Sequence, residues 1–383
     1  MSTTQRSSKT RTVADLAEAM ESIAPAWLAQ EWDNVGLVAG DPSATVRRVL
    51  LCVDMTAGVV DEALRMKADL ILAYHPPIFT PIRALRADGV GAETCVFQCI
   101  HNGIAVYCTH TALDAADGGT NDIIASLCGI QETEALEHVE ERSSTEFKLV
   151  VFVPAEHLES VADAIFNAGA GNIGDYSRCS YRLTGTGTFF GGEETDPAIG
   201  ERGRMEYVDE VRLESVVPSE ALPGVVAAIH RIHPYEEPAF DIYPLKAKPT
   251  RGIGRCGTLA PRCSLQALAR RLVQATSAPN VQIVGPADRT VTRAVIVVGA
   301  AGSLPFRISM TSHDVIVTGE IRHHDALKIR RLDCTAIALG HWASERPVLA
   351  PLAQRLKTLL PGIEARVSKA DRDPFRPIPA DGR

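Results

Sequence analysis

The 383-residue chain is poor in aromatic residues, and it lacks both a long apolar run and an excess of basic residues. Aromatic residues make up 5% of the chain, and the formal net charge is −8 at pH 7. Nucleic-acid binding needs basic surface and often stacking rings, so a nucleic-acid partner is not expected. No apolar stretch reaches the roughly 20 residues of a membrane-spanning helix, so we expect no membrane partner either.

The nine cysteines do not have the spacing of a disulfide framework or of a thiolate zinc site. Their number is odd, they are scattered along the chain, and no two form a Cys-x-x-Cys pair. Unpaired thiols of this kind are typical of a reducing compartment. We therefore predict a cytoplasmic protein.

Short apolar segments alternate with helical patterns at both ends of the chain. Helical spacing of apolar residues predicts helices at 13–30, 58–67 and 92–101. Buried strands are predicted at 48–54, 69–73, 104–108, 292–298, 314–318 and 335–340. A helical stretch is also expected after the small-residue turn at 299–302. Strands that alternate with helices favour an α/β fold with parallel strands, here one core formed by two halves of the sequence.

The middle of the chain contains an internal repeat with an offset of 64 residues. Residues 147–165 and 211–229 are identical at eight of 19 positions, and each copy has the pattern of a strand, a proline turn and a helix. Two strand–helix units of this kind form a ferredoxin-like α+β module. We therefore predict core halves at 1–145 and 249–383, interrupted by an inserted domain at 146–248.

Histidines and carboxylates follow four of the predicted strands. They are His75, His110 with Asp114, Glu320 with His324, and His341 with Glu345. Ligands of parallel α/β sheets bind beyond the carboxyl ends of the strands, so these side chains are expected to converge. Imidazole and carboxylate suit Zn²⁺, Fe²⁺ or Mn²⁺, and several such groups could hold two ions. The alternative for each i, i+4 pair alone is a solvated pair on a helix surface.

Six motifs, in order along nearly the whole chain, carry a family resemblance. They are Trp32-Asp-Asn-Val-Gly-Leu37, Tyr74-His-Pro-Pro-Ile-Phe79, His110-Thr-Ala-Leu-Asp114, Thr318-Gly-Glu-Ile-Arg-His-His-Asp325, Gly340-His-Trp-Ala-Ser-Glu345 and Asp371-Arg-Asp-Pro-Phe375. Together they resemble the Nif-three-like family, whose members are often labelled GTP cyclohydrolase 1 type 2 homologues or dinuclear metal centre hexameric proteins. The middle segment, with His233-Pro-Tyr-Glu-Glu-Pro238, resembles the CutA-like (PII-like) insert of the long bacterial members.

The resemblance implies a Nif-three-like core, a site for two divalent ions, and a homo-hexamer with a central cavity. By motif position it assigns His75, Asp114, His341 and Glu345 as ligands, with Glu345 as the bridge and His110 as an extra ligand. Tyr74 stands where the family has the first histidine of its motif. A neutral phenol is a far weaker ligand, so one ion would be held loosely or the site would hold a single ion.

Two functions remain open from the sequence. The first is a metal-dependent hydrolase of GTP cyclohydrolase type or phosphoesterase type, in which metal-activated water attacks a small-molecule substrate such as a nucleotide. Glu320 and His324 are then the candidates for proton transfer. The second is a non-catalytic, metal-dependent regulatory or ligand-binding protein, in which the insert gates access or binds a small ligand.

Overall fold

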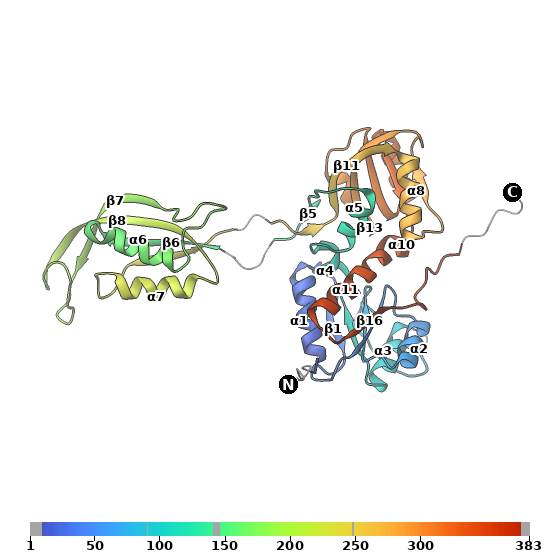
Figure 1. The fold of residues 1–383 in the computed structure, drawn as a ribbon, viewed down its shortest axis with the longest axis horizontal. Coiled ribbons are helices and arrows are strands. Elements are labelled where there is room, and N and C mark those ends of the chain that lie inside the picture. The colour runs from blue at the N-terminus through green and yellow to red at the C-terminus, as the bar shows by residue number, and fades with distance from the viewer. Residues whose placement is uncertain (1–9, 90, 141–145, 247–248, 377–383) are drawn as a thin grey trace, which may run out of the picture. The chain divides into compact units, whose positions relative to one another are not determined.

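The computed structural model describes residues 10–89, 91–140, 146–246 and 249–376 (Figure 1). The chain forms two compact units, one made of Met1–Glu140 with Pro249–Arg383 and the other of Glu141–Lys248. We call them the core unit and the inserted unit. In the described part of the chain, no helix combines the length and the apolar character required to cross a bilayer.

The first sheet of the core unit has the strand order β1-β4-β3-β2-β16. Its strands are β1 (Gly36–Ala39), β2 (Arg48–Cys52), β3 (Leu70–Ala73), β4 (Ala105–Cys108) and β16 (Glu364–Val367). All are parallel except β1, which pairs antiparallel with β4 at the edge. The central strands β3 and β4 are buried at every position because helices cover both faces of the sheet. One face packs against α1 (Val13–Ile23) and α11 (Leu349–Leu359), the other against α2 (Ala57–Met66) and α3 (Ala92–His101).

The second sheet of the core unit has the order β11-β13-β14-β15-β12. Its strands are β11 (Arg255–Ser264), β12 (Gln282–Val284), β13 (Thr290–Ala300), β14 (Asp314–Glu320) and β15 (Thr335–Ala338). The three central strands are parallel, and β11 and β12 are antiparallel edges. One face packs against α5 (Thr120–Cys128) and α8 (Leu265–Thr276), the other against α9 (His323–Arg331). A separate pair consists of β5 (Glu137–His138) and β10 (Gly252–Ile253).

The two halves of the sequence exchange elements within the core unit. β16, from the C-terminal half, completes the first sheet by pairing with β2. Helix α5, from the N-terminal half, packs in turn on the second sheet. The first sheet is therefore completed by a strand from the other half of the chain, and the second sheet is covered by a helix from the other half.

Two predicted helices differ from the structure. The first, predicted at 13–30, ends as α1 at Ile23 and is followed by Pro25 and a 3₁₀ turn, η1 (Ala26–Leu28). The helix stops there because a proline disfavours helical backbone at the residue before it. The helix expected after Gly302 is wrong, since only the 3₁₀ turn η3 (Leu304–Arg307) forms there. Phe306 within this turn, and Ile308 and Met310 after it, pack on the second sheet. Ile308, which ends the turn, has an extended backbone.

The inserted unit has the element order β-α-β-β-α-β, which is ferredoxin-like. The elements are β6 (Glu146–Pro154), η2 (Ala155–His157), α6 (Leu158–Asn167), β7 (Tyr181–Phe190), β8 (Met205–Pro218), α7 (Leu222–Ile232) and β9 (Phe240–Pro244). Its sheet, in the order β7-β8-β6-β9, is antiparallel. The repeat corresponds to β6–α6 and β8–α7. Its identical apolar pairs, such as Leu149 with Leu213 and Ile165 with Ile229, lie in the core of this unit.

Candidate metal centre

The histidines and carboxylates singled out in the sequence lie just after parallel strands of both sheets. His75 follows β3, and His110 begins α4 (His110–Ala115) after β4. Glu320 is the last residue of β14, and His341 and Glu345 are the first and last residues of α10 (His341–Glu345), which follows β15. The site is therefore assembled from both halves of the sequence.

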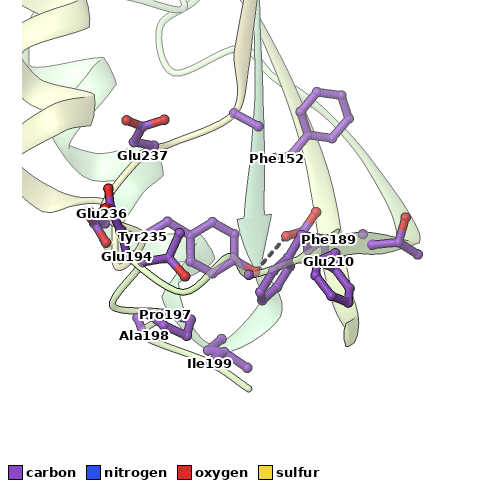
Figure 2. Close-up of a pocket in the computed structure, with 16 residues that line it drawn as sticks. Phe152, Phe189, Glu194, Pro197, Ala198, Ile199, Glu210, Tyr235, Glu236 and Glu237 are labelled. Atoms are coloured by element: carbon purple, nitrogen blue, oxygen red, sulfur yellow. Dashed lines mark hydrogen bonds between the residues drawn. The ribbon is translucent and has the colours of Figure 1, made fainter. Parts of the chain in front are cut away.

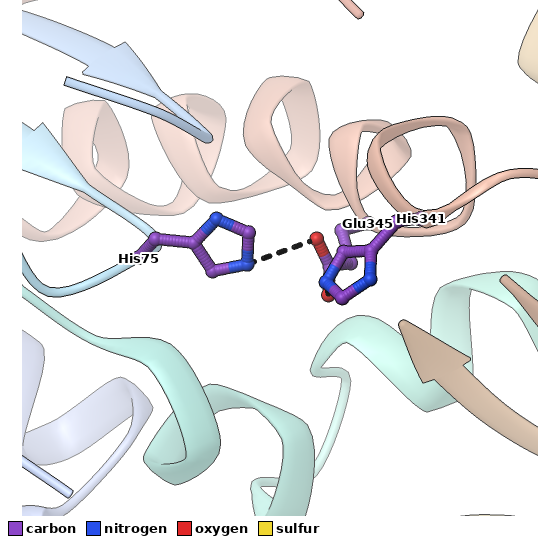
Figure 3. Close-up of side chains that lie close together, drawn as sticks. All are labelled: His75, His341 and Glu345. Carbon is purple, nitrogen blue, oxygen red and sulfur yellow. Dashed lines mark ion pairs between the residues drawn. The ribbon is translucent and has the colours of Figure 1, made fainter. Parts of the chain in front are cut away.

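His75, His341 and Glu345 form a compact group, with one ligand atom from each lying within 4.8 Å of the others. His75 Nε2 lies 3.2 Å from Glu345 Oε2, and His341 Nε2 lies 3.2 Å from Glu345 Oε1. Figure 3 shows the two imidazole rings against the carboxylate. The Glu345 side chain is only 4% exposed, and its two oxygens contact the Nε2 atoms of His75 and His341. Two imidazole nitrogens and a buried carboxylate are ligand types of divalent metal ions, so a cation fits between them.

A carboxylate oxygen lies close to the Nδ1 atom of each of three histidine rings. Asp54 and Asp33 are hydrogen-bonded to His75 Nδ1 at 2.8 Å and His110 Nδ1 at 2.9 Å. Glu320 forms an ion pair with His341 Nδ1 at 3.1 Å. This contact fixes the ring orientation and leaves Nε2 for a ligand, as in carboxylate–histidine–metal arrangements. Sequence reasoning missed Asp33 and Asp54. The available signals were weak, because Asp33 lies in the Trp32 motif and Asp54 only ends a predicted strand.

His110 and Asp114, the other two predicted ligands, are not part of the compact group formed by His75, His341 and Glu345, but His110 lies close to it. The ring centroids of His110 and His75 are 5.4 Å apart. His110 has an unusual backbone φ of 23°, and its N–H donates to the Tyr74 carbonyl at 2.9 Å. Strain of this kind at a non-glycine residue is often found at functional sites. His324 lies at the start of α9 against the ring of His323, and within the described ranges no hydrogen bond or ion pair joins it to the triad.

The Tyr74 ring packs against the ring of His75, with centroids 5.2 Å apart, but its hydroxyl points to Asp114. Its hydroxyl donates to Asp114 Oδ1 at 2.5 Å. Burial raises the pKa of Asp114 to about 6; the Tyr74 hydrogen bond opposes the rise and the charge of Glu345 adds to it. Burial, followed by the charge of Asp114, raises the pKa of Tyr74 well above its usual value. Tyr74 is therefore a neutral phenol that occupies one oxygen of Asp114.

The charges within the triad are strongly coupled. Burial would lower the pKa of His75, but Asp54 and Glu345 raise it to about 10. The pKa of His341 is raised chiefly by its contact with Glu345. Burial would raise the pKa of Glu345, but the two histidines hold it below its usual range. A divalent cation would replace the imidazolium protons as the positive partner of this carboxylate.

Asp371 ties the elements around the site together. It is buried, and it accepts hydrogen bonds from Val53 N at 2.8 Å, Trp342 Nε1 at 3.0 Å and Arg346 Nη1 at 2.6 Å. Val53 precedes Asp54, the residue that orients His75, and Trp342 follows His341. The C-terminal segment therefore links the ends of both halves of the site.

The pattern of the Duf34/NIF3 family (NGG1p interacting factor 3) matches residues 11–374. The chain belongs to this family. The prediction from the six motifs is thereby confirmed.

Relatives cover nearly the full length of this Duf34/NIF3 chain. The "GTP cyclohydrolase 1 type 2 homolog" of Bacillus subtilis is 35% identical over 365 residues, which cover 94% of this chain and 97% of the relative. The protein of the same name from Mycobacterium leprae is 36% identical over 368 residues, covering 95% and 94%. The crystal structure of a Bacillus cereus protein related to NIF3 matches with a TM-score of 0.79 and 33% identity, covering 97% of this chain and all of that one.

Proposed function

We propose that the core unit binds one or two divalent metal ions and uses them to hydrolyse a small-molecule substrate. The observation that carries the proposal is the convergence of His75 Nε2 and His341 Nε2 on the buried carboxylate of Glu345, each 3.2 Å from one of its oxygens. Two imidazoles and a carboxylate form a donor set that suits Zn²⁺, Fe²⁺ or Mn²⁺. The name of the relatives, GTP cyclohydrolase 1 type 2 homolog, supports a nucleotide-like substrate.

The two ion positions differ in their donors. His75, His341 and Glu345 would hold the first ion, whereas His110 and Asp114 would hold a second that shares Glu345. One oxygen of Asp114 is already bound to the Tyr74 hydroxyl, so the second position offers fewer free donors. We therefore propose that the first position binds its ion more tightly, and that a single ion occupies the site when metal is scarce.

The residues around the ions have distinct tasks in this proposal. A bound ion supplies water with a lowered pKa and polarises a substrate oxygen. Asp54 and Glu320 hold the rings of His75 and His341 with Nε2 turned inward. Glu320 is 52% exposed, so it can also exchange a proton between His341 and solvent. His324 remains the second candidate for proton transfer.

A cavity of about 450 Å³ borders the triad on the side of Glu320 and His341. Arg322, Asn280 and Phe375 also line it. Its volume is in the range of small-molecule sites, and its lining combines two arginines, the carboxylates of Glu320 and Asp373, two amides and an aromatic ring. A substrate with an anionic group and a planar ring would fit this lining, which is consistent with a nucleotide.

Other parts of the proposal rest on the family and on the fold. We propose that the core halves at 1–145 and 249–383 act as one domain interrupted by a CutA-like (PII-like) insert at 146–248, and that the protein is a cytoplasmic homo-hexamer. The β-α-β-β-α-β order of the insert supports the CutA-like module, and the nine free cysteines support the cytoplasm. Mass measurement in solution tests the hexamer.

Metal content tests the site directly. Purified protein is expected to bind Zn²⁺ or Mn²⁺ and to show anomalous scattering at the His75–His341–Glu345 group. A His341→Ala/Glu345→Ala variant is expected to lose this ion, whereas His101→Ala, which removes an exposed histidine on α3, keeps it. Retention of the ion by the double variant would refute the assigned position.

Turnover separates the hydrolase from a regulatory protein. Metal-loaded protein is incubated with GTP, other nucleotides and generic phosphoesters, and the double variant sets the background. Hydrolysis by the wild type alone supports the enzyme. If metal-loaded wild type and the double variant hydrolyse every substrate at the same background rate, the second candidate, a metal-dependent regulatory protein, is favoured.

A further inference from the structure

The inserted unit contains a cavity of about 460 Å³ (Figure 2), a volume typical of small-molecule sites. It lies within this unit, between the ends of β7 and β8, the loop at 191–199 and the segment that follows α7. Aromatic side chains provide much of its wall. Phe189 and Tyr235 stand edge to face, with ring centroids 6.2 Å apart, and Phe152 adds a third ring.

The charge of the cavity is entirely negative. Glu194, Glu210, Glu236 and Glu237 line it, and the lining residues include no lysine, arginine or histidine. Residues 146–248 contain 17 acidic and 9 basic residues, so their net charge of −8 equals that of the whole chain. The insert therefore has an excess of acidic groups, which attracts cations and repels anions.

Some of these carboxylates are held in place, and others are free for a ligand. The Tyr235 hydroxyl donates to Glu210 Oε1 at 2.7 Å, and a Cβ at Gly187 would overlap the Glu210 carboxylate. Glu236 accepts the backbone N–H of Asp196 at 3.1 Å, which anchors the loop. In the described part of the chain, the carboxylates of Glu194 and Glu237 have no hydrogen bond or ion pair.

We propose that this cavity binds a small organic cation, either a protonated amine or a quaternary ammonium group with an apolar body. Aromatic faces attract such cations through the ring quadrupole, most strongly where water is excluded. The carboxylates of Glu210, Glu194 and Glu237 balance the ligand's charge, and the rings of Phe189 and Tyr235 contact its apolar part. A bare metal ion would make no use of the aromatic wall. This inference is independent of the metal centre in the core unit.

A matched pair of probes separates charge from shape. Choline is titrated into the full-length protein by calorimetry, beside the uncharged dimethylbutanol in which carbon replaces the quaternary nitrogen. We expect choline to bind about tenfold more tightly than the neutral probe, and its affinity to fall as salt rises. Equal affinity for the two probes, or no binding of choline at millimolar concentration, would overturn the proposal.

Three charge-neutralising variants locate the binding in this cavity. Glu210→Gln and Glu237→Gln each remove a carboxylate from its lining, and Glu237→Gln breaks no contact within the described residues, so it leaves the fold intact. Glu220→Gln removes an exposed carboxylate elsewhere in the insert. We expect choline affinity to fall about tenfold for Glu210→Gln and about threefold for Glu237→Gln, and to stay unchanged for Glu220→Gln. The same affinity in Glu237→Gln and Glu220→Gln, both folded by circular dichroism, would place choline elsewhere and refute the assignment.

Discussion

Substitution of Gly299 by alanine tests how the backbone of β13 holds Glu345 in place. Gly299 has a φ of +61°, and an added Cβ would lie 2.5 Å from Glu345 Oε1 and 3.3 Å from His341 Nε2. The first distance is far inside van der Waals contact. Glu345 is buried, so its carboxylate cannot move freely into solvent. We expect the methyl group to push this carboxylate out of its position between His75 and His341.

The loss of metal affinity can be separated from the loss of stability that alanine causes at a positive φ. Alanine in the left-handed region costs about 1–2 kcal/mol in free energy of unfolding. Gly302, in the same segment, has a φ of +55° and no atom within 4 Å of its Cβ position. Gly302→Ala therefore carries the same backbone cost without the contact. Disturbing the residues that position a ligand typically lowers metal affinity about 10–100-fold, which we expect for Gly299→Ala only.

The assay is competition for Zn²⁺ against a chromophoric chelator, with urea unfolding in EDTA to measure the stability of each metal-free variant. Gly299→Ala should show both the backbone cost and the loss of affinity, whereas Gly302→Ala should show the backbone cost alone. If the two variants bind Zn²⁺ equally well, the contact between the added methyl group and Glu345 is not what disturbs the site, and the packing argument fails.

Three further predictions follow from other contacts. Asp371→Ala should lower the free energy of unfolding by about 3 kcal/mol, because Arg346, whose side chain is 25% exposed, loses its only carboxylate partner in the described chain. Asp373→Ala in the same segment should change it far less, and similar urea midpoints for the two variants would contradict this. Asp54→Asn should weaken Zn²⁺ affinity about 10-fold or more, because His75 loses the carboxylate on its Nδ1; chelator competition measures the change, and an unchanged affinity would rule out the orienting role. Burial lowers the pKa of His233 below 6.5, so the unfolded state binds its proton first and stability is lost as pH falls through and below 6.5. The thermal unfolding midpoint should therefore fall more steeply between neutral and acidic pH in wild type than in His233→Gln. Parallel plots of midpoint against pH would exclude this histidine as a cause.

Much of the fold follows from local pattern. The apolar segment around β3 predicts a buried strand because both faces of its sheet are covered and every side chain must be apolar. The eight identities between 147–165 and 211–229 indicate two equivalent strand–helix units, because equivalent positions of the two copies are buried in the same core. By contrast, the segment after Gly302 could not be assigned from local pattern. Its apolar residues at 306, 308 and 310 pack on the second sheet through a 3₁₀ turn and the extended residue that follows it, and that packing cannot be read from the local sequence.

The site divides in the same way. By itself, the sequence determined which ionisable residues follow parallel strands, because strand ends carry a recognisable pattern, and the motifs determined the family. Only the tertiary structure decided which of these residues meet. His75 and Glu345 are separated by 270 positions in the chain, yet their atoms lie 3.2 Å apart. The roles of Asp33 and Asp54 on their histidines, and of Tyr74 on Asp114, also depend on contacts that no local pattern encodes. The physical reason is that a strand's sequence records how deeply it is buried, whereas the partner of a polar side chain is set by which elements pack around it.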